Sequence, residues 1–269
     1  MSFTVSVAQI PLQEGNPEAN LATAKQAVCL AAQRGSDLLL LPELWLSGYD
    51  LENAGALALA PGDPFWEIMG ELAQTANIAI AGSVLSRSVA GVQNLLVIFS
   101  SKGKCLASYA KVHLFGPMKE DRYLVAGNGL AIADLGWCRA GLAICYDLRF
   151  PELFRLLASS GAAIILLPAQ WPHPRLMPWR TLVRARAIEN QVFLLAANRV
   201  GKAGDLTYCG HSMIVDPTGD ILQEAGEHPT LLTVEIDLAQ IIETRERMPV
   251  WGDRRPDIYQ RWLTPKFHD

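Results

Sequence analysis

The stretch GLAICYDLRFPE, residues 141–152, decides how the rest of the chain is organised. Its apolar run ends at Cys145, and the RFPE that follows is typical of the start of a helix. A thiol therefore stands where a buried strand turns into a helix. Backbone N–H groups at such a turn are not all used by the strand or the helix, and a helix N-terminus favours negative charge. The position predicts a lowered thiol pKa and hydrogen-bond donors for an oxyanion.

Apolar strands and helices alternate on both sides of that stretch. Residues 4–10 and 37–43 are strand-like, and Asn16 followed by Pro17 predicts the start of a helix between them. The apolar run in 37–43 is typical of a strand covered on both faces. We therefore predict an α/β fold with sheets buried under helices. Further helices are expected over 63–77, 151–160 and 177–191, further strands over 78–85, 94–100, 105–111, 140–145, 162–169 and 192–198, and a hairpin over 211–225.

No linker or low-complexity segment divides the 269 residues. We therefore expect a single domain over 1–269, with the C-terminal tail, about 249–269, as an extension. Half of the residues are hydrophobic, which is enough for a large core. The formal charge is −4, and no cluster of Lys and Arg indicates a surface for nucleic acid, so no nucleic-acid partner is expected.

The distribution of apolar residues and cysteines bears on where the protein works. No apolar run approaches the ~18 residues needed to span a bilayer, so no membrane association is expected. The first residues lack a basic segment followed by an apolar stretch, and we expect a cytoplasmic protein. The five cysteines are widely spread, and no pair has C-x-x-C spacing. This pattern predicts reduced thiols, without a zinc site or a disulfide framework.

Three polar residues stand at the ends of apolar strand-like runs, where ligands gather in open α/β sheets. They are Glu43, Lys111 and Cys145. Together they can form a nucleophilic site in which Glu43 takes the thiol proton and Lys111 stabilises an oxyanion. Each also has an ordinary explanation, as a capping glutamate, a surface lysine and a core cysteine. Spacing alone does not bring the three together.

Three segments carry a resemblance to a known family. LLLLPELWLSGYD (38–50), YAKVHLFG (109–116) and GLAICYDLRFPELFR (141–155) resemble the signature segments of the nitrilase superfamily of carbon–nitrogen hydrolases, in the same order and at similar intervals. Residues 184–201 and 211–222 are similar to later segments of the family. The resemblance implies an α-β-β-α sandwich that pairs into a homodimer with eight layers.

The resemblance also implies roles for individual residues. Glu43 corresponds to the catalytic base, Lys111 to the catalytic lysine and Cys145 to the nucleophile. A further glutamate often follows the lysine segment, and Glu120 matches it, with Asp121 beside it as the alternative and a solvated loop of charges as the ordinary explanation. A departure is the alanine before the lysine, where the family often has a basic residue.

The implied reaction is the hydrolysis of a small amide through a cysteine thioester. Lys111 and, we expect, the backbone N–H of Tyr146 hold the oxyanion while ammonia leaves, and water then releases the acid. No metal ion or organic cofactor is needed. The same residues could attack a nitrile or a carbamoyl group, although nitrile-hydrolysing members tend to be longer. A nitrilase-like protein that only binds a partner is a further alternative.

A hydrolase of the papain type would need an imidazole beside the thiol. None of the histidines has a supporting local signature, so this alternative is disfavoured. The histidines are His113, His173, His211, His228 and His268.

The segment QWPHPRLMPWR, residues 170–180, follows a predicted strand and is expected at the same rim as Cys145. It brings Trp171, Arg175 and Trp179 there. An arginine can bind a carboxylate through two parallel hydrogen bonds, and tryptophans can wall off a short acyl chain. The segment most resembles the ω-amidase branch, whose substrates are monoamides of short dicarboxylic acids such as α-ketoglutaramate and succinamate. Arg149 is the alternative anchor, and Arg175 could equally cap the loop or pair with a surface acid.

Overall fold

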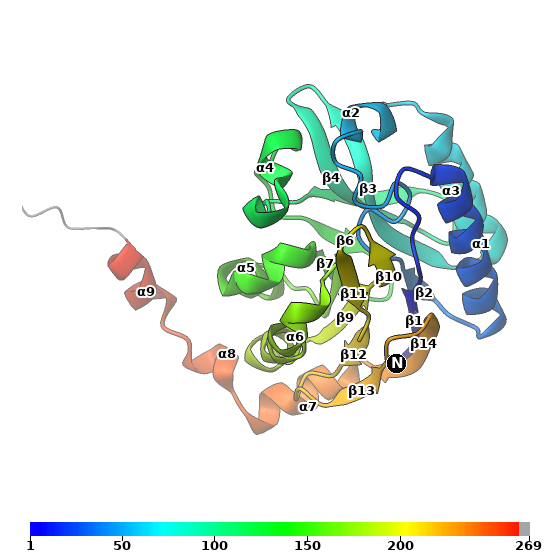
Figure 1. Cartoon of the computed structure of the whole chain (residues 1–269). Coiled ribbons are helices and arrows are strands. Elements are labelled where there is room, and N and C mark those ends of the chain that lie inside the picture. Colours follow the sequence, from blue (N-terminus) through cyan, green and yellow to red (C-terminus); the bar gives the residue numbers. More distant parts are fainter. Residues whose placement is uncertain (264–269) are drawn as a thin grey trace, which may run out of the picture.

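Two six-stranded sheets pack face to face in the structure, a computed structural model that describes residues 1–263 (Figure 1). Neighbouring strands β1, β2 and β3 are parallel, as are β7, β8 and β9, and the remaining pairs within the two sheets are antiparallel. The first sheet has the order β14 (Thr230–Asp237), β1 (Ser2–Gln9), β2 (Leu38–Leu40), β3 (Ala79–Ser88), β4 (Gly91–Phe99) and β5 (Cys105–Ala110). The second has the order β13 (Ile221–Glu224), β12 (Met213–Val215), β9 (Phe193–Asn198), β8 (Ile164–Ala169), β7 (Arg139–Leu142) and β6 (Ile132–Asp134).

Helices cover the outer face of each sheet. α1 (Pro17–Gln33) and α3 (Pro64–Ala76) lie on the first sheet, and α5 (Pro151–Ser159) and α6 (Leu176–Asn190) lie on the second (Figure 1). The predicted α-β-β-α sandwich is thereby confirmed. The shorter elements are α2 (Ala54–Leu57), α4 (Glu120–Tyr123), α7 (Ala239–Arg247), α8 (Val250–Asp253), α9 (Pro256–Leu263), the 3₁₀ turns η1 (Gly116–Met118), η2 (Cys145–Arg149) and η3 (His173–Arg175), and the hairpin of β10 (Val200–Ala203) and β11 (Leu206–Cys209).

The start of α1 follows from its sequence. The Asn16 side chain accepts a hydrogen bond from the Ala19 N–H at 3.2 Å, and Pro17 occupies the first helical position, where a missing N–H costs nothing. This is the helix start that the sequence predicts.

The apolar run of β2 supplies both layers of the core. Leu38 and Leu40 belong to the cluster between the two sheets, whereas Leu39 and Leu41 pack with residues of α1 and α3. Successive side chains of a strand point to opposite faces, so a strand covered on both sides has to be apolar throughout. The run therefore places the residues that follow it, including Glu43, at the end of a strand in the middle of the fold.

The strand before Cys145 ends earlier than predicted. β7 ends at Leu142, Cys145 begins the 3₁₀ turn η2, and α5 starts only at Pro151. A proline disfavours the helical conformation for the residue before it, and Phe150 is extended, with φ −110° and ψ 95°. The helix thus begins at Pro151, as predicted, whereas the strand predicted over 140–145 ends at Leu142, and a 3₁₀ turn separates Cys145 from the helix.

The C-terminal helices lead away from the sandwich. Figure 1 shows α8 and α9, in orange and red, beyond α7. That the chain forms one domain with an extension over about 249–269 stays a prediction, and positions 264–269, including His268, lie outside the described residues. Within residues 1–263, no helix is long and apolar enough to cross a membrane.

Candidate active site

Glu43, Lys111 and Cys145 meet in the interior, near the ends of three strands. The Lys111 Nζ lies 2.8 Å from Glu43 Oε1, and Glu43 also makes a side-chain hydrogen bond with the Cys145 thiol. Glu43 is 0 % exposed, Lys111 1 % and Cys145 8 %, which excludes a surface lysine. The three groups therefore form one buried cluster at the point where the sequence predicts a site.

The turn that carries Cys145 is held by a buried carboxylate. Asp147 Oδ2 accepts hydrogen bonds from the Ile144 N–H and the Tyr109 hydroxyl, both at 2.8 Å. Its Oδ1 lies 2.7 Å from Nδ1 of His113. Cys145 itself has φ 46°, a left-handed conformation that a residue with a side chain adopts only when its surroundings impose it. These contacts fix the direction in which the thiol points.

Burial dominates the electrostatics of the thiol. It raises the pKa of Cys145 well above its ordinary value, and the nearby Glu43 carboxylate raises it further, while Lys111 opposes the shift. The prediction of a lowered thiol pKa is therefore wrong. The thiol lies in a five-residue 3₁₀ turn next to a carboxylate, and it lacks the helix N-terminus on which that prediction depended.

The two partners of the thiol are shifted in the same direction. Burial raises the pKa of Glu43, although Lys111 partly offsets the effect. For Lys111, burial opposes the charged form most strongly, but the carboxylates of Glu43 and Glu120 together outweigh it and raise its pKa. The lysine is therefore held as an ammonium, and Glu43 is a weaker acid than an exposed glutamate.

The structure brings Glu120 into the cluster and leaves Asp121 exposed. Glu120 is fully buried, and its Oε1 lies 2.7 Å from the Lys111 Nζ. The same oxygen accepts a hydrogen bond from the Tyr49 hydroxyl, and Oε2 accepts one from the Phe115 N–H at 2.6 Å. Both oxygens of Glu120 are thus used inside the protein.

Sequence reasoning missed several residues that hold the cluster together. Asn94 donates from Nδ2 to Glu43 Oε1 at 2.8 Å, and the Gln170 N–H donates to Glu43 Oε2 at 2.8 Å. Tyr49 and Phe115 contact Glu120 as described above. The only signal in the sequence was the position of these residues at the ends of strands. Asn94 opens a predicted strand, and Gln170 directly follows one.

The backbone N–H of Tyr146 has no hydrogen-bond acceptor among residues 1–263. Its ring lies against Phe115 and Phe150, with ring centroids 4.8 and 5.2 Å away. Tyr146 lines a cavity together with Cys145, and the N–H next to the thiol is therefore free to meet a ligand.

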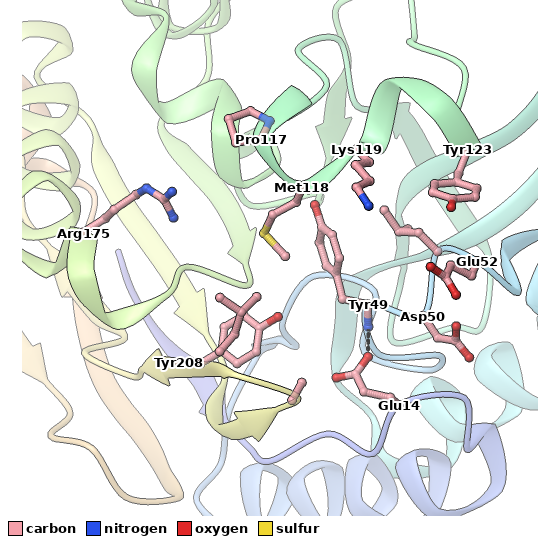
Figure 2. Close-up of a pocket in the computed structure, with 13 residues that line it drawn as sticks. Glu14, Tyr49, Asp50, Glu52, Pro117, Met118, Lys119, Tyr123, Arg175 and Tyr208 are labelled. Atoms are coloured by element: carbon pink, nitrogen blue, oxygen red, sulfur yellow. Dashed lines mark hydrogen bonds between the residues drawn. The ribbon is translucent and has the colours of Figure 1, made fainter.

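The cavity over Cys145 is narrow, and Tyr146, Gln170 and Trp171 are among the residues that line it. Tyr49, Met118 and Arg175 line both this cavity and a wider outer pocket. Figure 2 shows these three side chains around the outer pocket, with the carboxylates of Glu14, Asp50 and Glu52 on one side of it. The outer pocket and the cavity over the thiol therefore adjoin.

Trp171 and Arg175 lie where the sequence predicts them, in the wall of the cavity. The Trp171 Nε1 donates to the Arg175 carbonyl at 2.8 Å, and the Arg175 guanidinium lies over the Phe115 ring at 5.2 Å. Arg149 lines the same cavity, with its guanidinium 5.0 Å from the Trp171 ring centroid. Within the described part of the chain, neither guanidinium has an acidic partner.

Trp179 does not line the cavity, contrary to the prediction. It is fully buried in α6, behind Trp171, and its Nε1 donates to the His211 carbonyl at 2.7 Å. The helical turn between the two tryptophans directs Trp179 toward the sheet, so of these two residues only Trp171 lines the cavity.

Neither an imidazole nor a metal cluster accompanies the thiol in the described residues. No histidine in 1–263 lines the cavity over Cys145. His113 instead faces Asp147 and stacks on Phe150. No group of three or more His, Cys, Asp or Glu side chains in this part of the chain could hold a metal ion. The charged groups beside the thiol are the Glu43 carboxylate and the Lys111 ammonium.

A buried thiol beside a carboxylate and an ammonium, under a small cavity of an α-β-β-α sandwich, is the arrangement of a cysteine-dependent hydrolase of carbon–nitrogen bonds. The family model of carbon–nitrogen hydrolases matches residues 4–246. The chain therefore belongs to the carbon–nitrogen hydrolases of the nitrilase superfamily and is an amidase that acts on non-peptide amides.

Relatives and solved structures agree with this assignment. The chain is 38% identical over 260 residues to a 2-oxoglutaramate amidase of Bacillus subtilis, covering 96% of this chain and 100% of the relative. It is 37% identical over 231 residues to an omega-amidase of Escherichia coli, covering 85% and 87%. A structure of a variant of the amidase from Nesterenkonia sp. AN1, with acrylamide added at the active-site cysteine, has a TM-score of 0.84 at 28% identity, and the match covers 97% of this chain and 99% of that chain. The resemblance to the ω-amidase branch is confirmed.

Proposed function

We propose that the protein is an ω-amidase that hydrolyses monoamides of short dicarboxylic acids to the diacid and ammonia, with Cys145 as the nucleophile. The observation that carries the proposal is the position of the buried Glu43–Lys111–Cys145 cluster beneath a cavity whose wall presents two guanidiniums, Arg149 and Arg175. The likeness to a 2-oxoglutaramate amidase and to an omega-amidase supports the choice of substrate.

The first half of the reaction forms a thioester. Glu43 takes the Cys145 proton, and the thiolate attacks the amide carbon. The Lys111 ammonium and the Tyr146 N–H stabilise the oxyanion. Protonated Glu43 then gives its proton to the departing nitrogen, so that ammonia leaves. A carboxyl group whose pKa is raised by burial suits both proton transfers. Its ionised form is a stronger base than an exposed carboxylate, and its protonated form can still give the proton to the leaving nitrogen.

The second half hydrolyses the thioester. Glu43 removes a proton from water, the resulting hydroxide attacks the acyl carbon, and the proton returns to the departing sulfur. Glu120 takes part indirectly, because its oxygens already accept hydrogen bonds from Lys111, Tyr49 and the Phe115 N–H. We assign to Glu120 the role of holding Lys111 in place and charged.

Substrate choice depends on the wall of the cavity. Arg175 binds the remote carboxylate through two parallel hydrogen bonds, and Trp171 packs against the short chain between carboxylate and amide. Arg149, whose guanidinium lies over the Trp171 ring, is the alternative anchor. An arginine without an acidic partner can neutralise an incoming carboxylate without first losing an existing ion pair.

A substrate panel tests this function. Ammonia release is measured with succinamate, α-ketoglutaramate, an uncharged amide of similar length, a matching nitrile and a carbamoyl amino acid. We expect the highest kcat/KM for the two anionic amides. Faster turnover of the nitrile or the carbamoyl compound would assign the site to a different reaction of the superfamily, and an absence of turnover on every compound would favour a binding protein.

We also propose that the protein is a homodimer. Leu153, Phe154 and Leu157 of α5 pack into the core, so they do not support pairing. Leu156 of α5 and Met177 and Ile188 of α6 are exposed apolar side chains on the outer helices, and they do support it. Light scattering at working concentration tests the proposal, and a monomer with full activity would refute it.

A further inference from the structure

An ion pair between a buried arginine and a partly exposed glutamate joins two loops beside the catalytic cluster. Glu14 lies between β1 and α1, and Arg199 directly follows β9, so the two are 185 residues apart in the chain. An Nη1 hydrogen bond joins them, and Arg199 is 0 % exposed. Arg199 also donates from Nη2 to the Leu12 carbonyl at 2.6 Å and lies 4.4 Å from the centroid of the Tyr208 ring. Burial of the Arg199 guanidinium costs desolvation energy, which offsets much of the attraction within the pair, so the pair adds little to stability. The pair therefore invites a functional explanation.

One chain of hydrogen bonds runs from Arg199 to the base. Arg199 Nη1 donates to Gln170 Oε1 at 2.9 Å. Since a guanidinium can only donate, this bond orients the Gln170 amide with its nitrogen toward the Glu43 carbonyl, to which it donates at 2.7 Å. The Gln170 N–H also donates to Glu43 Oε2. Arg199 thus positions Gln170, and Gln170 in turn binds both the backbone carbonyl and the carboxylate of Glu43.

A second chain runs from Glu14 to the lysine. Glu14 Oε2 accepts a hydrogen bond from the Tyr49 N–H, which Figure 2 shows as a dashed line. The Tyr49 hydroxyl donates to Glu120 Oε1, the oxygen that also accepts from the Lys111 Nζ. Lys111 in turn contacts Glu43. The two chains therefore start from one ion pair and close into a ring on the catalytic cluster.

We infer that Glu14 and Arg199 form a positioning pair, which sets the placement of Glu43 and Lys111 and so the rate of attack by Cys145. The inference rests on the proposed function, since it assigns the pair to the same cluster. Neither residue lines the cavity over Cys145, and Glu14 faces the outer pocket, so both act through Gln170 and Tyr49. A displacement of about 1 Å at a reacting group can lower a rate by about 100-fold, so loss of the Glu14–Arg199 pair can have an effect of this size on the reaction rate.

The main variant is Glu14→Gln, which keeps the size of the side chain and leaves Arg199 in place. Glu14 accepts from Arg199 with one oxygen and from the Tyr49 N–H with the other. Glutamine replaces one of these oxygens with an NH₂ donor, so one of the two hydrogen bonds is lost. We expect kcat to fall by about 10- to 100-fold with little change in KM. Arg199→Met tests the other end of the pair and should have at least the same effect. Arg199→Lys keeps the charge but cannot reach three acceptors in a fixed geometry, so it should restore only part of the rate.

A second readout separates positioning from a merely structural role. The rate at which iodoacetamide alkylates Cys145 is followed against pH, without any substrate. If Gln170 shifts, its N–H no longer donates a hydrogen bond to the ionised Glu43 carboxylate. The loss of this bond favours the protonated form of Glu43. The midpoint of alkylation should therefore move to higher pH in Glu14→Gln and Arg199→Met. A pair that only supports the fold would lower Tm and leave this midpoint unchanged.

Arg180→Met is the matched control. Arg180 forms another long-range ion pair, with Glu224 at 2.8 Å, and it lines neither the cavity over Cys145 nor the outer pocket. This variant should keep the wild-type kcat and midpoint. A folded Glu14→Gln protein with both values unchanged would overturn the inference, even if Arg199→Met fails to fold. Turnover by Cys145→Ala would instead overturn the proposed function, so the two failures are distinguishable.

Discussion

Two parts of the active site differ in how fully their charged groups are partnered. In the buried cluster, Glu43 and Lys111 contact each other and several fixed donors and acceptors. In the cavity wall, Arg149 and Arg175 lie against aromatic rings and have no acidic partner within residues 1–263. Charges in the interior are stable only when paired, so the cluster is confined to one arrangement. The guanidiniums of the wall are not paired in this way, so under the proposed function the chemistry and the selectivity depend on different groups.

The largest expected effect comes from removing the nucleophile. Cys145→Ala should abolish hydrolysis, because no other group of the cluster can form the thioester. The loss of one sulfur atom beside an open cavity should leave the fold intact. Mass spectrometry of the wild type with a slow substrate should show an acyl adduct on Cys145. Cys29→Ala and Cys209→Ala serve as controls, and an adduct on either cysteine would contradict the assignment.

Removing the charge at the centre of the cluster should have the next largest effect. Lys111→Met loses an oxyanion donor, so we expect kcat to fall by at least about 10²–10³-fold. It also leaves Glu43 and Glu120 buried without their shared cation, which should lower Tm clearly. Single-turnover acylation and thermal unfolding measure the two effects. Lys102→Met, at an exposed lysine, is the control, and normal acylation in Lys111→Met would assign the oxyanion to other donors.

A change in the wall should affect one class of substrate only. Arg175→Ala should lower kcat/KM for succinamate by about 10- to 100-fold, the loss expected for a charged hydrogen-bonded pair, and should spare an uncharged amide of similar length. Arg149→Ala, compared in the same assay, identifies which arginine is the anchor. Equal losses on both substrates would remove Arg175 from the carboxylate site.

The smallest effect is a shift in pH dependence. Glu43 has to be ionised to take the thiol proton, and burial raises its pKa, so activity should fall with decreasing pH at a midpoint above the ordinary value of 4.5. Asn94→Leu removes a hydrogen bond to the ionised form, which raises that pKa further. The acid limb of the kcat/KM profile should move to higher pH. Asn128→Ala, at an exposed asparagine, should leave the profile unchanged.

Local sequence patterns predicted much of the fold. Asn16 and Pro17 marked a helix start, and the apolar run at Leu38–Leu40 marked a strand covered on both faces. These features depend on neighbours in the chain and are therefore visible in it. Strand β14 gave no such signal, because its place beside β1 depends on eight pairings such as Ser2 with Asp237, across almost the whole chain.

The choice between adjacent residues in the site could not be predicted. Glu120 and Asp121 stand in one charged stretch, yet only Glu120 is buried against Lys111. The direction of the Cys145 pKa shift was likewise missed, because it depends on burial and on Glu43, which is 102 positions away in the sequence. Trp179 was misplaced for a related reason, since the turn of α6 decides which side chains face the cavity.

The sequence by itself determined the alternation of strands and helices, the family to which its three signature segments belong, and the candidacy of Glu43, Lys111 and Cys145. Only the tertiary structure decided that these groups touch and that Glu120 joins the cluster. It also decided that Glu14 and Arg199 pair and connect to the cluster through Tyr49 and Gln170. The physical reason is that periodicity and capping are properties of neighbouring residues. Burial, ion pairing and pKa values are set by groups that only the folded chain brings within a few ångströms.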